Sequence, residues 1–385
     1  EKIFLHKLPK IKKNKLIWFH AASIGEVQSI IPLIKKINKD DKNINFLITS
    51  VTLTSGKLIE EKFKDFSNLE HRYFPLDISF LVKNFLDIWC PDIVVFVDSE
   101  IWPNYLIEIK KRKTPLILLN GRITKKTFYR WRLFPNFSKK LFSNFDLCLS
   151  SSRESFNYLK KLNFKNIKFI GNLKFAESEN QSISDNNILK DLFKIKKTWC
   201  ASSTHHGEEL LCGLVHLELK KKHKNILTII IPRHVERTNE IKNDLEKLKL
   251  KVHLDEPKKK INSDTDIYLV NSYGKTKSFY KRCQNVFLGG SIIKRGGQNP
   301  LEAARFGCTI LHGPNIDNFR EIYEFLKKSK ISYKISSQKN LFDNLVKLFS
   351  KKIKTKKVRE KIKLKGRQIL GKTYNEISNN RLNEF

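Results

Sequence analysis

Short apolar runs recur through the first half of the chain, and segments of helical length separate them. The runs between Leu16 and Gly171 are LIWFHA, NFLITS, HRYF, IVVFVD, LILLN, LCLSS and IKFIG. Apolar runs of about four to eight residues are typical of parallel strands that are buried on both faces of a sheet. Since parallel strands need crossover connections, usually helices, the pattern predicts a Rossmann-like α/β domain over residues 1–171.

The series of apolar runs is interrupted once and then resumes. Residues 172–194 are largely polar and indicate a linker, and the later runs are TWCASS, ILTIIIP, KVHL, DIYLV, NVFLGG, CTILHG and ISYKI. A second Rossmann-like domain over residues 172–350 is the economical interpretation. The expected fold class is therefore α/β, with two Rossmann-like domains facing a central cleft.

The chain is strongly basic. It has 75 Lys and Arg against 39 Asp and Glu, which gives a formal net charge of +36 at pH 7. Such a charge favours an anionic partner, whether a nucleic acid, an anionic lipid or a phosphorylated substrate, and its sign does not choose among them. Residues 351–385 begin with a basic run and predict a terminal helix that packs back on the first domain. A solvated helix and a contact with anionic lipid are the alternatives.

Cysteine spacing and hydropathy exclude several classes of protein. The six cysteines include no CxxC pair and mostly lie in apolar runs, which indicates a reducing compartment and no metal site. No apolar run reaches the roughly 18 residues that a membrane-spanning helix needs. The sequence contains no Met, so we expect it to begin downstream of the natural start, where an N-terminal anchor could precede it.

The richest loop for chemistry is FLGGSIIKRGGQNPLEAARFG, residues 287–307. Two Gly-Gly pairs flank a Lys-Arg pair, and Asn-Pro then opens a predicted helix. Glycines let backbone N–H groups approach an anion, and a helix N-terminus favours negative charge, so the loop predicts a phosphate site. An ordinary turn with a capped helix would explain Asn299 and Pro300 but not the flanking glycine pairs. The candidate binding residues are Lys294, Arg295, Gly296, Asn299 and, for ribose hydroxyls, Glu302.

Two other loops of the second predicted domain carry polar groups at strand ends. CASSTHHGEEL, residues 200–210, supplies the candidates Ser203, Thr204 and His205. Its HHxEE pattern lacks a third ligand at helical spacing, so hydrogen bonding to an anion is favoured over zinc. IIIPRHVER, residues 229–237, supplies Arg233 and His234, where an arginine could bind a phosphate with two hydrogen bonds. A solvated loop is the competing interpretation.

In the first predicted domain, three loops place polar groups after strands. They are WFHAASIGEV with Ser23, Gly25 and Glu26, FVDSEIWPN with Glu100, and LNGRIT with Arg122. Because carboxyl ends of parallel strands share one edge of a sheet, Glu26 and Glu100 are expected to face one cavity. A favourable acid in the first turn of an ordinary helix is the alternative for Glu26, and a helix N-terminus would lower its pKa.

Taken in order, six motifs resemble one family. They are WFHAASIGE, DSEIWPN, NGRIT, SSTHHGEE, PRHVER and GGSIIKRGGQNPLEAA. The family is the 3-deoxy-D-manno-octulosonic acid (Kdo) transferases, which attach Kdo to the lipid A precursor of Gram-negative bacteria. The resemblance implies a GT-B fold and an inverting, metal-independent transferase that uses CMP-Kdo as donor and no further cofactor. It implies Glu26 as the general base, Glu100 on the acceptor side, and the second-domain loops on the CMP side.

The resemblance also implies a location and leaves alternatives open. Family members attach to the cytoplasmic face of the inner membrane, so an anionic membrane surface and the lipid A precursor are the expected partners. The stretch YLVNSYGKTKSFY departs from the family pattern at Asn271, Tyr273 and Lys275, which leaves the cytidine contacts there open. A nucleotide-sugar 2-epimerase would share the architecture, and a basic membrane or nucleic-acid binder is the non-enzymatic alternative. No recognised nucleic-acid motif is present, so no nucleic-acid partner is expected. The oligomeric state and the number of Kdo residues added stay open.

Overall fold

The computed structural model describes residues 14–177, 193, 196–256, 261–351 and 355–378. The chain divides into two compact units. The first consists of Glu1–Ser178 with Lys363–Phe385, and the second of Glu179–Ile362. The first unit therefore extends beyond the expected boundary at residue 171, because η1 (Leu173–Ala176) packs on α1 (Ile24–Asp40).

The first unit contains a seven-stranded sheet in the order β3-β2-β1-β4-β5-β6-β7. The strands are β1 (Leu16–His20), β2 (Asn45–Ser50), β3 (Leu69–Tyr73), β4 (Ile93–Val97), β5 (Leu116–Gly121), β6 (Leu147–Ser150) and β7 (Ile167–Phe169). Every pairing is parallel, and all residues of β1, β2, β4, β5 and β6 are buried. This confirms the Rossmann-like sheet predicted from the apolar runs.

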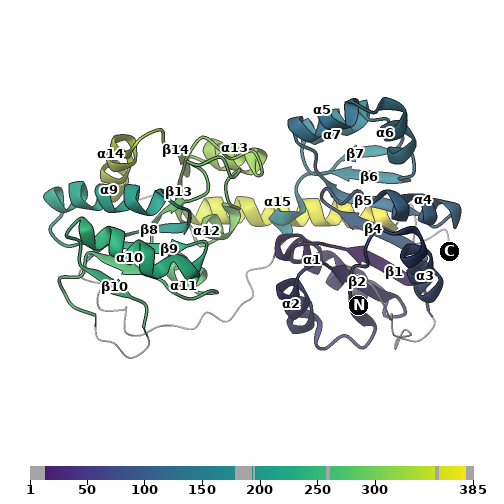
Figure 1. Cartoon of the computed structure of the whole chain (residues 1–385), viewed down its shortest axis with the longest axis horizontal. Coiled ribbons are helices and arrows are strands. Elements are labelled where there is room, and N and C mark those ends of the chain that lie inside the picture. Colours follow the sequence, from purple (N-terminus) through teal and green to yellow (C-terminus); the bar gives the residue numbers. More distant parts are fainter. Residues whose placement is uncertain (1–13, 178–192, 194–195, 257–260, 352–354, 379–385) are drawn as a thin grey trace. The chain divides into compact units, whose positions relative to one another are not determined.

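Helices connect these strands (Figure 1). They are α1, α2 (Leu53–Phe63), α3 (Ser79–Trp89), α4 (Pro103–Lys111), α5 (Lys125–Arg132), α6 (Pro135–Phe142) and α7 (Arg153–Lys161). The core on one side of the sheet is aromatic, with Trp18 fully buried among Phe85, Phe96 and Tyr105 at ring separations of 4.9 to 5.6 Å. Strand order reverses between β1 and β4, and at such a switch point the loops after the strands form a ligand site.

The second unit repeats this architecture, with strand order β10-β11-β9-β8-β12-β13-β14 and parallel pairing throughout. The strands are β8 (Lys197–Thr204), β9 (Ile226–Pro232), β10 (Val252–Leu254), β11 (Ile267–Leu269), β12 (Asn285–Leu288), β13 (Thr309–His312) and β14 (Ser332–Lys334). The helices are α9 (Glu208–Lys222), η3 (Val235–Arg237), α10 (Thr238–Lys247), α11 (Thr276–Tyr280), α12 (Leu301–Arg305), α13 (Arg320–Lys328) and α14 (Gln338–Phe349). Each of the seven predicted apolar runs supplies one strand, which confirms the second α/β domain.

The terminal helix α15 (Thr355–Ile377) contributes to both units, since the first unit takes the chain from Lys363 onward. From Lys363 onward the helix packs on the rest of the first unit. Gly366 lies against the Phe175 carbonyl, where a Cβ would clash, Lys168 pairs with Glu376 at 2.7 Å, and Lys36 Nζ lies 4.2 Å from the ring centre of Tyr374. Among the helices of the described residues, none combines the length and the apolar character needed to cross a membrane.

Candidate functional site

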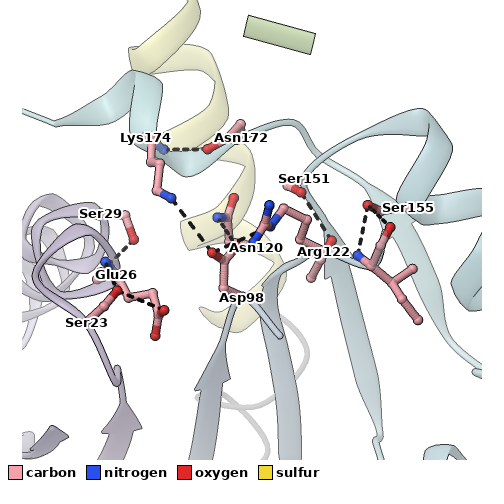
Figure 2. Close-up of polar contacts among 12 residues, drawn as sticks. Ser23, Glu26, Ser29, Asp98, Asn120, Arg122, Ser151, Ser155, Asn172 and Lys174 are labelled. Atoms are coloured by element: carbon pink, nitrogen blue, oxygen red, sulfur yellow. Dashed lines mark hydrogen bonds and ion pairs between the residues drawn. The ribbon is translucent and has the colours of Figure 1, made fainter. Parts of the chain in front are cut away.

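The loops after β1, β4 and β5 lie at one edge of the first sheet. These strands are neighbours in parallel register, with His20 beside Phe96 and Val97 beside Leu119. The loop after β1 leads into α1, and the loops after β4 and β5 carry Asp98 and Arg122. Figure 2 shows Glu26, Asp98 and Arg122 at this edge. The sheet therefore brings together polar groups from three loops that are far apart in the sequence.

Glu26 is held by the start of α1. Ser23 is the N-cap residue, and its hydroxyl accepts a hydrogen bond from the Glu26 backbone N–H at 3.4 Å. In return the Ser23 hydroxyl donates to Glu26 Oε1 at 2.9 Å, and the Ala22 N–H donates to Oε2 at 2.8 Å. This reciprocal capping fixes the carboxylate and shows that the first-turn structural role considered for Glu26 is present. The capping role and a role in catalysis are compatible, because one side chain can serve both.

The pKa of Glu26 is raised to about 7 from the ordinary value of 4.5. Burial is the main cause, and the negative charges of Asp98 and Glu100 add to it. The hydrogen bonds from Ser23 and Ala22 act in the opposite direction but are smaller effects. The expectation that the helix N-terminus would lower this pKa is wrong, since desolvation and two nearby carboxylates outweigh the helix dipole. A carboxylate with a pKa near 7 suits a general base at neutral pH.

A stability prediction follows from this raised pKa. The unfolded chain releases the Glu26 proton near pH 4.5 and the native chain near pH 7, so the free energy of unfolding falls as the pH rises through this window. We expect Glu26→Gln to raise the free energy of unfolding by on the order of 1 kcal/mol at pH 8, a figure reduced because the side chain is partly exposed. The gain should be smaller at pH 4. Thermal melts at both pH values measure it, and a variant that melts below wild type at pH 8 would contradict the prediction.

Asp98 and Lys174 belong to the same site, although neither was a predicted site residue. Asp98 follows β4 with a left-handed backbone (φ 64°) and is 5 % exposed. Its carboxylate accepts from Asn120 Nδ2 at 3.1 Å and lies 3.7 Å from Lys174 Nζ and 3.9 Å from Arg122 Nε (Figure 2). The predicted binding residue Arg122 is thus paired with Asp98. Lys174 was not predicted as a site residue, because it lies in the polar stretch 172–194 that indicates a linker.

Glu100 lies close enough to Glu26 for its charge to raise the Glu26 pKa. Its Oε2 accepts hydrogen bonds from Trp102 Nε1 at 2.8 Å and from His20 Nε2 at 3.3 Å. The predicted residues Glu26 and Glu100 therefore interact electrostatically, together with Asp98. A group of three acidic side chains can accept hydrogen bonds from several hydroxyls of one sugar.

In the second unit, the buried carboxylate of Glu208 lies in the turn that begins at the first glycine pair of the 287–307 loop and accepts hydrogen bonds from its backbone N–H groups. Its Oε2 accepts from the N–H groups of Gly290 at 2.7 Å and His205 at 3.0 Å, and its Oε1 accepts from those of Ile292 at 3.1 Å and Ser291 at 3.3 Å. These backbone N–H groups were expected to approach a phosphate. That expectation is wrong for this pair, because an internal anion already fills the concavity that the N–H groups form.

Gly289 is required for this arrangement. A Cβ at this position would lie 2.5 Å from the Ser203 carbonyl oxygen and 2.7 Å from Glu208 Oε2. The first distance is to backbone and cannot be relieved by a rotamer change. The glycine therefore permits the loop after β12 to pack against the loop after β8.

The rest of the 287–307 loop departs from the expected helix site in one respect. Gly296 and Gly297 have positive φ values of 83° and 75°, as a tight turn requires. Asn299 Oδ1 accepts from the Leu301 N–H at 3.1 Å, so Asn299 helps to start α12. Helix α12 has only five residues, so its dipole is small. Glu302 is half-exposed and lies 3.7 Å from Lys277 Nζ.

Basic side chains from the loops after β8, β9 and β12 gather in the second unit. The rings of His205 and His234 lie 5.8 Å apart. The pKa of His205 is lowered, first by burial and then by the charges of His234, Arg295 and Arg233. Three predicted binding residues thus lie close enough to a fourth, His205, for their charges to act on it. Ser203 and Thr204 lie at the end of β8, where the Thr204 carbonyl accepts from the Arg233 N–H at 2.9 Å.

Two other sequence features have local partners. Arg237, which shares the PRHVER motif, pairs with Glu209 at 3.2 Å. In the segment that departs from the family pattern, Lys275 pairs with Asp255 at 2.7 Å and the Tyr273 hydroxyl donates to Glu236 at 3.0 Å. Across the residues that the structure describes, no group of three or more His, Cys, Asp or Glu side chains is arranged to hold a metal ion.

Comparison with known proteins gives the family. Residues 2–177 match the family model described as 3-deoxy-D-manno-octulosonic-acid transferase (kdotransferase). The chain is 31% identical over 344 residues to the 3-deoxy-D-manno-octulosonic acid transferase of Rickettsia prowazekii, covering 88% of this chain and 72% of that protein. It is 27% identical over 358 residues to the corresponding protein of Haemophilus influenzae, covering 92% and 83%.

A solved structure shows the same fold at low identity. The UDP-GlcNAc 2-epimerase of Neisseria meningitidis, bound to UDP-GlcNAc, superimposes with a TM-score of 0.61 and 13% identity, covering 96% of this chain and all of that one. The architecture is therefore that of two-domain enzymes with the GT-B fold. Within that class, the chain belongs to the 3-deoxy-D-manno-octulosonic acid transferase family.

Proposed function

We propose that this protein is an inverting glycosyltransferase that moves Kdo from CMP-Kdo to the lipid A precursor in lipopolysaccharide synthesis. Its membership of the Kdo transferase family supports the reaction class. The observation that carries the mechanism is Glu26, fixed at the start of α1 with a pKa near 7 and with Asp98 and Glu100 close by. Such a carboxylate suits a general base, and it lies at the edge of the sheet where ligands of α/β enzymes bind.

In the proposed reaction, the Glu26 carboxylate takes the proton of an acceptor hydroxyl. The hydroxyl oxygen forms a bond to the anomeric carbon of Kdo, on the face opposite to the bond that breaks. CMP departs with that bond pair on its phosphate oxygen. Glu100 accepts a hydrogen bond from a hydroxyl of the acceptor. Arg122 and Lys174 offer positive charge to the anionic groups of the lipid acceptor. Independence of metal ions and of further cofactors is part of the proposal.

The basic cluster of the second unit is proposed to hold CMP-Kdo. The charges of Arg233, His234 and Arg295 all act on His205, which supports a common anionic ligand for these residues. Positive charge there would stabilise the developing negative charge on the departing phosphate. The proposed donor-binding residues are Ser203, Thr204, His205, Arg233, His234, Lys294, Arg295, Gly296, Asn299 and Glu302.

The test is a transfer assay with the purified protein, CMP-Kdo and lipid A precursor, followed by mass spectrometry of the lipid. We expect a product heavier by one or more Kdo residues, and CMP release only when the lipid is present. A 2-epimerase would instead change the nucleotide sugar without the lipid acceptor. Unchanged lipid under conditions where the protein binds CMP would contradict the proposed transferase.

An exposed apolar and basic surface on α5 and α6 supports attachment to the cytoplasmic face of the inner membrane. Tyr129, Leu133, Phe134 and Phe137 are 50 to 73% exposed. Lysines and arginines surround them in the sequence: Lys125, Lys126, Arg130, Arg132, Lys139 and Lys140. Apolar side chains among basic ones bind anionic bilayers through both burial and charge.

We expect Leu133→Ser with Phe134→Ser to weaken binding to vesicles that contain anionic lipid by roughly tenfold, since two large apolar side chains no longer enter the bilayer. Vesicle sedimentation measures the change. Leu53→Ser is a matched control, because Leu53 is 71% exposed but lies on α2. Equal binding by the double variant and the control would place the membrane contact elsewhere.

A further inference from the structure

A buried hydrogen-bond chain joins the first two strands of the first unit to Glu100. Trp18 Nε1 donates to Thr49 Oγ1 at 2.9 Å, and Thr49 Oγ1 lies 3.0 Å from His20 Nδ1. His20 Nε2 lies 3.3 Å from Glu100 Oε2. Trp18, His20 and Thr49 are fully buried, so no solvent competes for the hydrogen bonds among these three side chains.

The chemistry of the groups fixes the direction of the chain. An ionised carboxylate can only accept, so His20 Nε2 carries the proton that is shared with Glu100. Burial lowers the pKa of His20, which favours the neutral ring. With the single ring proton on Nε2, Nδ1 is an acceptor. Nδ1 then accepts a hydrogen bond from the Thr49 hydroxyl, while the Thr49 oxygen accepts a hydrogen bond from the Trp18 indole N–H. One tautomer of His20 satisfies all of these bonds.

Packing fixes the plane of the His20 ring. Phe74 stacks on it at 3.7 Å between ring centres and 21° between planes, and Phe96 meets it edge-on at 5.4 Å and 69°. Stacking fixes the plane of the ring, and the hydrogen bonds at Nδ1 and Nε2 fix which ring nitrogen faces Glu100. The carboxylate of Glu100 is therefore held by a rigid donor from the strand core.

Both donors to Glu100 act on the same oxygen. Trp102 Nε1 donates to Oε2 at 2.8 Å and His20 Nε2 reaches Oε2 at 3.3 Å. The other oxygen, Oε1, accepts no hydrogen bond from the residues that the structure describes. The Glu100 side chain is 16% exposed. One oxygen is thus anchored and the second is available to a ligand.

We propose that His20 and Thr49 are positioning residues that orient the Glu100 carboxylate so that Oε1 accepts a hydrogen bond from a hydroxyl of the acceptor sugar. This inference rests on the proposed function. A carboxylate already held in place loses less freedom when the acceptor binds, so the contact strengthens acceptor binding and alignment. The donor sugar nucleotide does not need this contact.

Two variants test the positioning role. Thr49→Val keeps a branched side chain of similar volume but removes the hydroxyl that donates to Nδ1, and His20→Phe keeps an aromatic ring but removes Nε2–H. We expect each to raise the KM for the lipid acceptor about tenfold, the effect of about 1.4 kcal/mol. The KM for CMP-Kdo should stay within about twofold of wild type. His20→Gln, whose amide can donate to Glu100, should recover part of the loss.

The second unit offers a matched control. His216 is also fully buried, with Nδ1 2.8 Å from Thr228 Oγ1 and Nε2 3.3 Å from Asp266 Oδ1. It has the same kind of partners as His20 but no bond to Glu100. Thr228→Val and His216→Phe should therefore lower thermal stability and leave the acceptor KM unchanged.

The outcomes separate this inference from the proposed function. The ¹⁵N NMR spectrum of wild type should show His20 as a neutral ring protonated on Nε2, and this readout needs no activity. A ring protonated on Nδ1, or folded Thr49→Val and His20→Phe variants whose acceptor KM matches that of the His216 and Thr228 controls, would overturn the positioning role. If wild type transfers no Kdo, the proposed function fails, while the spectrum still decides the hydrogen-bond chain.

Discussion

Glu26→Gln is expected to lower kcat for Kdo transfer about 10³-fold, because the acceptor hydroxyl loses the group that takes its proton. The amide can still accept the hydrogen bond from the Ala22 N–H or from the Ser23 hydroxyl, so the start of α1 should stay folded. CMP affinity should be unchanged, since the basic residues proposed to bind CMP lie in the second unit. Initial-rate assays and calorimetric titration with CMP measure the two quantities.

The dependence of kcat/KM on pH tests the role of Glu26 as a base. A base with a pKa of about 7 must be ionised to act, so kcat/KM should fall as the pH drops below about 7. Asp98→Asn removes one of the negative charges that raise this pKa and should move the fall in activity to lower pH. Glu154→Gln is the control, since Glu154 is an acid in the first turn of α7 in the same unit. Near-normal turnover by Glu26→Gln would exclude Glu26 as the base.

Glu208→Ala is expected to have the second large effect, on stability and on donor binding. The substitution leaves four backbone N–H groups from two loops without their carboxylate acceptor. An unsatisfied buried donor costs about 1 to 3 kcal/mol, and water entering the space would satisfy some of the four, so we expect a loss of about 4 kcal/mol in unfolding free energy. The loops after β8 and β12 should then separate, and CMP affinity should fall by at least about 100-fold.

Denaturant unfolding and calorimetric titration with CMP measure these losses. Glu240→Ala is a suitable control, because Glu240 is an acid in the first turn of α10 and is exposed. The losses for Glu208→Gln should lie between those of Glu208→Ala and those of the control. The amide oxygen can still accept hydrogen bonds from backbone N–H groups, while the amide NH₂ group would face N–H donors. If Glu208→Ala has the same unfolding free energy and the same CMP affinity as wild type, the glycine-rich loop does not depend on the Glu208 carboxylate.

The strands were predictable because their signal is local. A parallel strand buried on both faces is mostly apolar along its length, as IVVFV in β4 and ILTIIIP in β9 are. The loops that follow such strands could then be assigned to one edge of each sheet. Sequence analysis therefore found Glu26, Glu100, Arg122 and Arg233 as candidates, although it could not supply their distances.

What sequence analysis missed depends on contacts between distant residues. Lys174 lies in a polar stretch with no strand or helix pattern, and only the fold brings it 3.7 Å from Asp98. Glu208 and Gly290 are 82 residues apart, so nothing in either motif indicates that the Gly290 N–H donates a hydrogen bond to the Glu208 carboxylate. For the same reason the sequence pattern predicts a phosphate site at Gly289 and Gly290, whose N–H groups have acceptors elsewhere in the fold.

The sequence by itself determined the two α/β units, the order of their elements, and the loops that carry the candidate site residues. These properties follow from local apolar patterns and from the rule that parallel strands end at a common edge. Only the tertiary structure decided the raised pKa of Glu26 and the orientation of Glu100. A pKa depends on desolvation and on charges from other loops, and a side-chain orientation depends on donors such as His20 and Trp102, so both are set by neighbours in space.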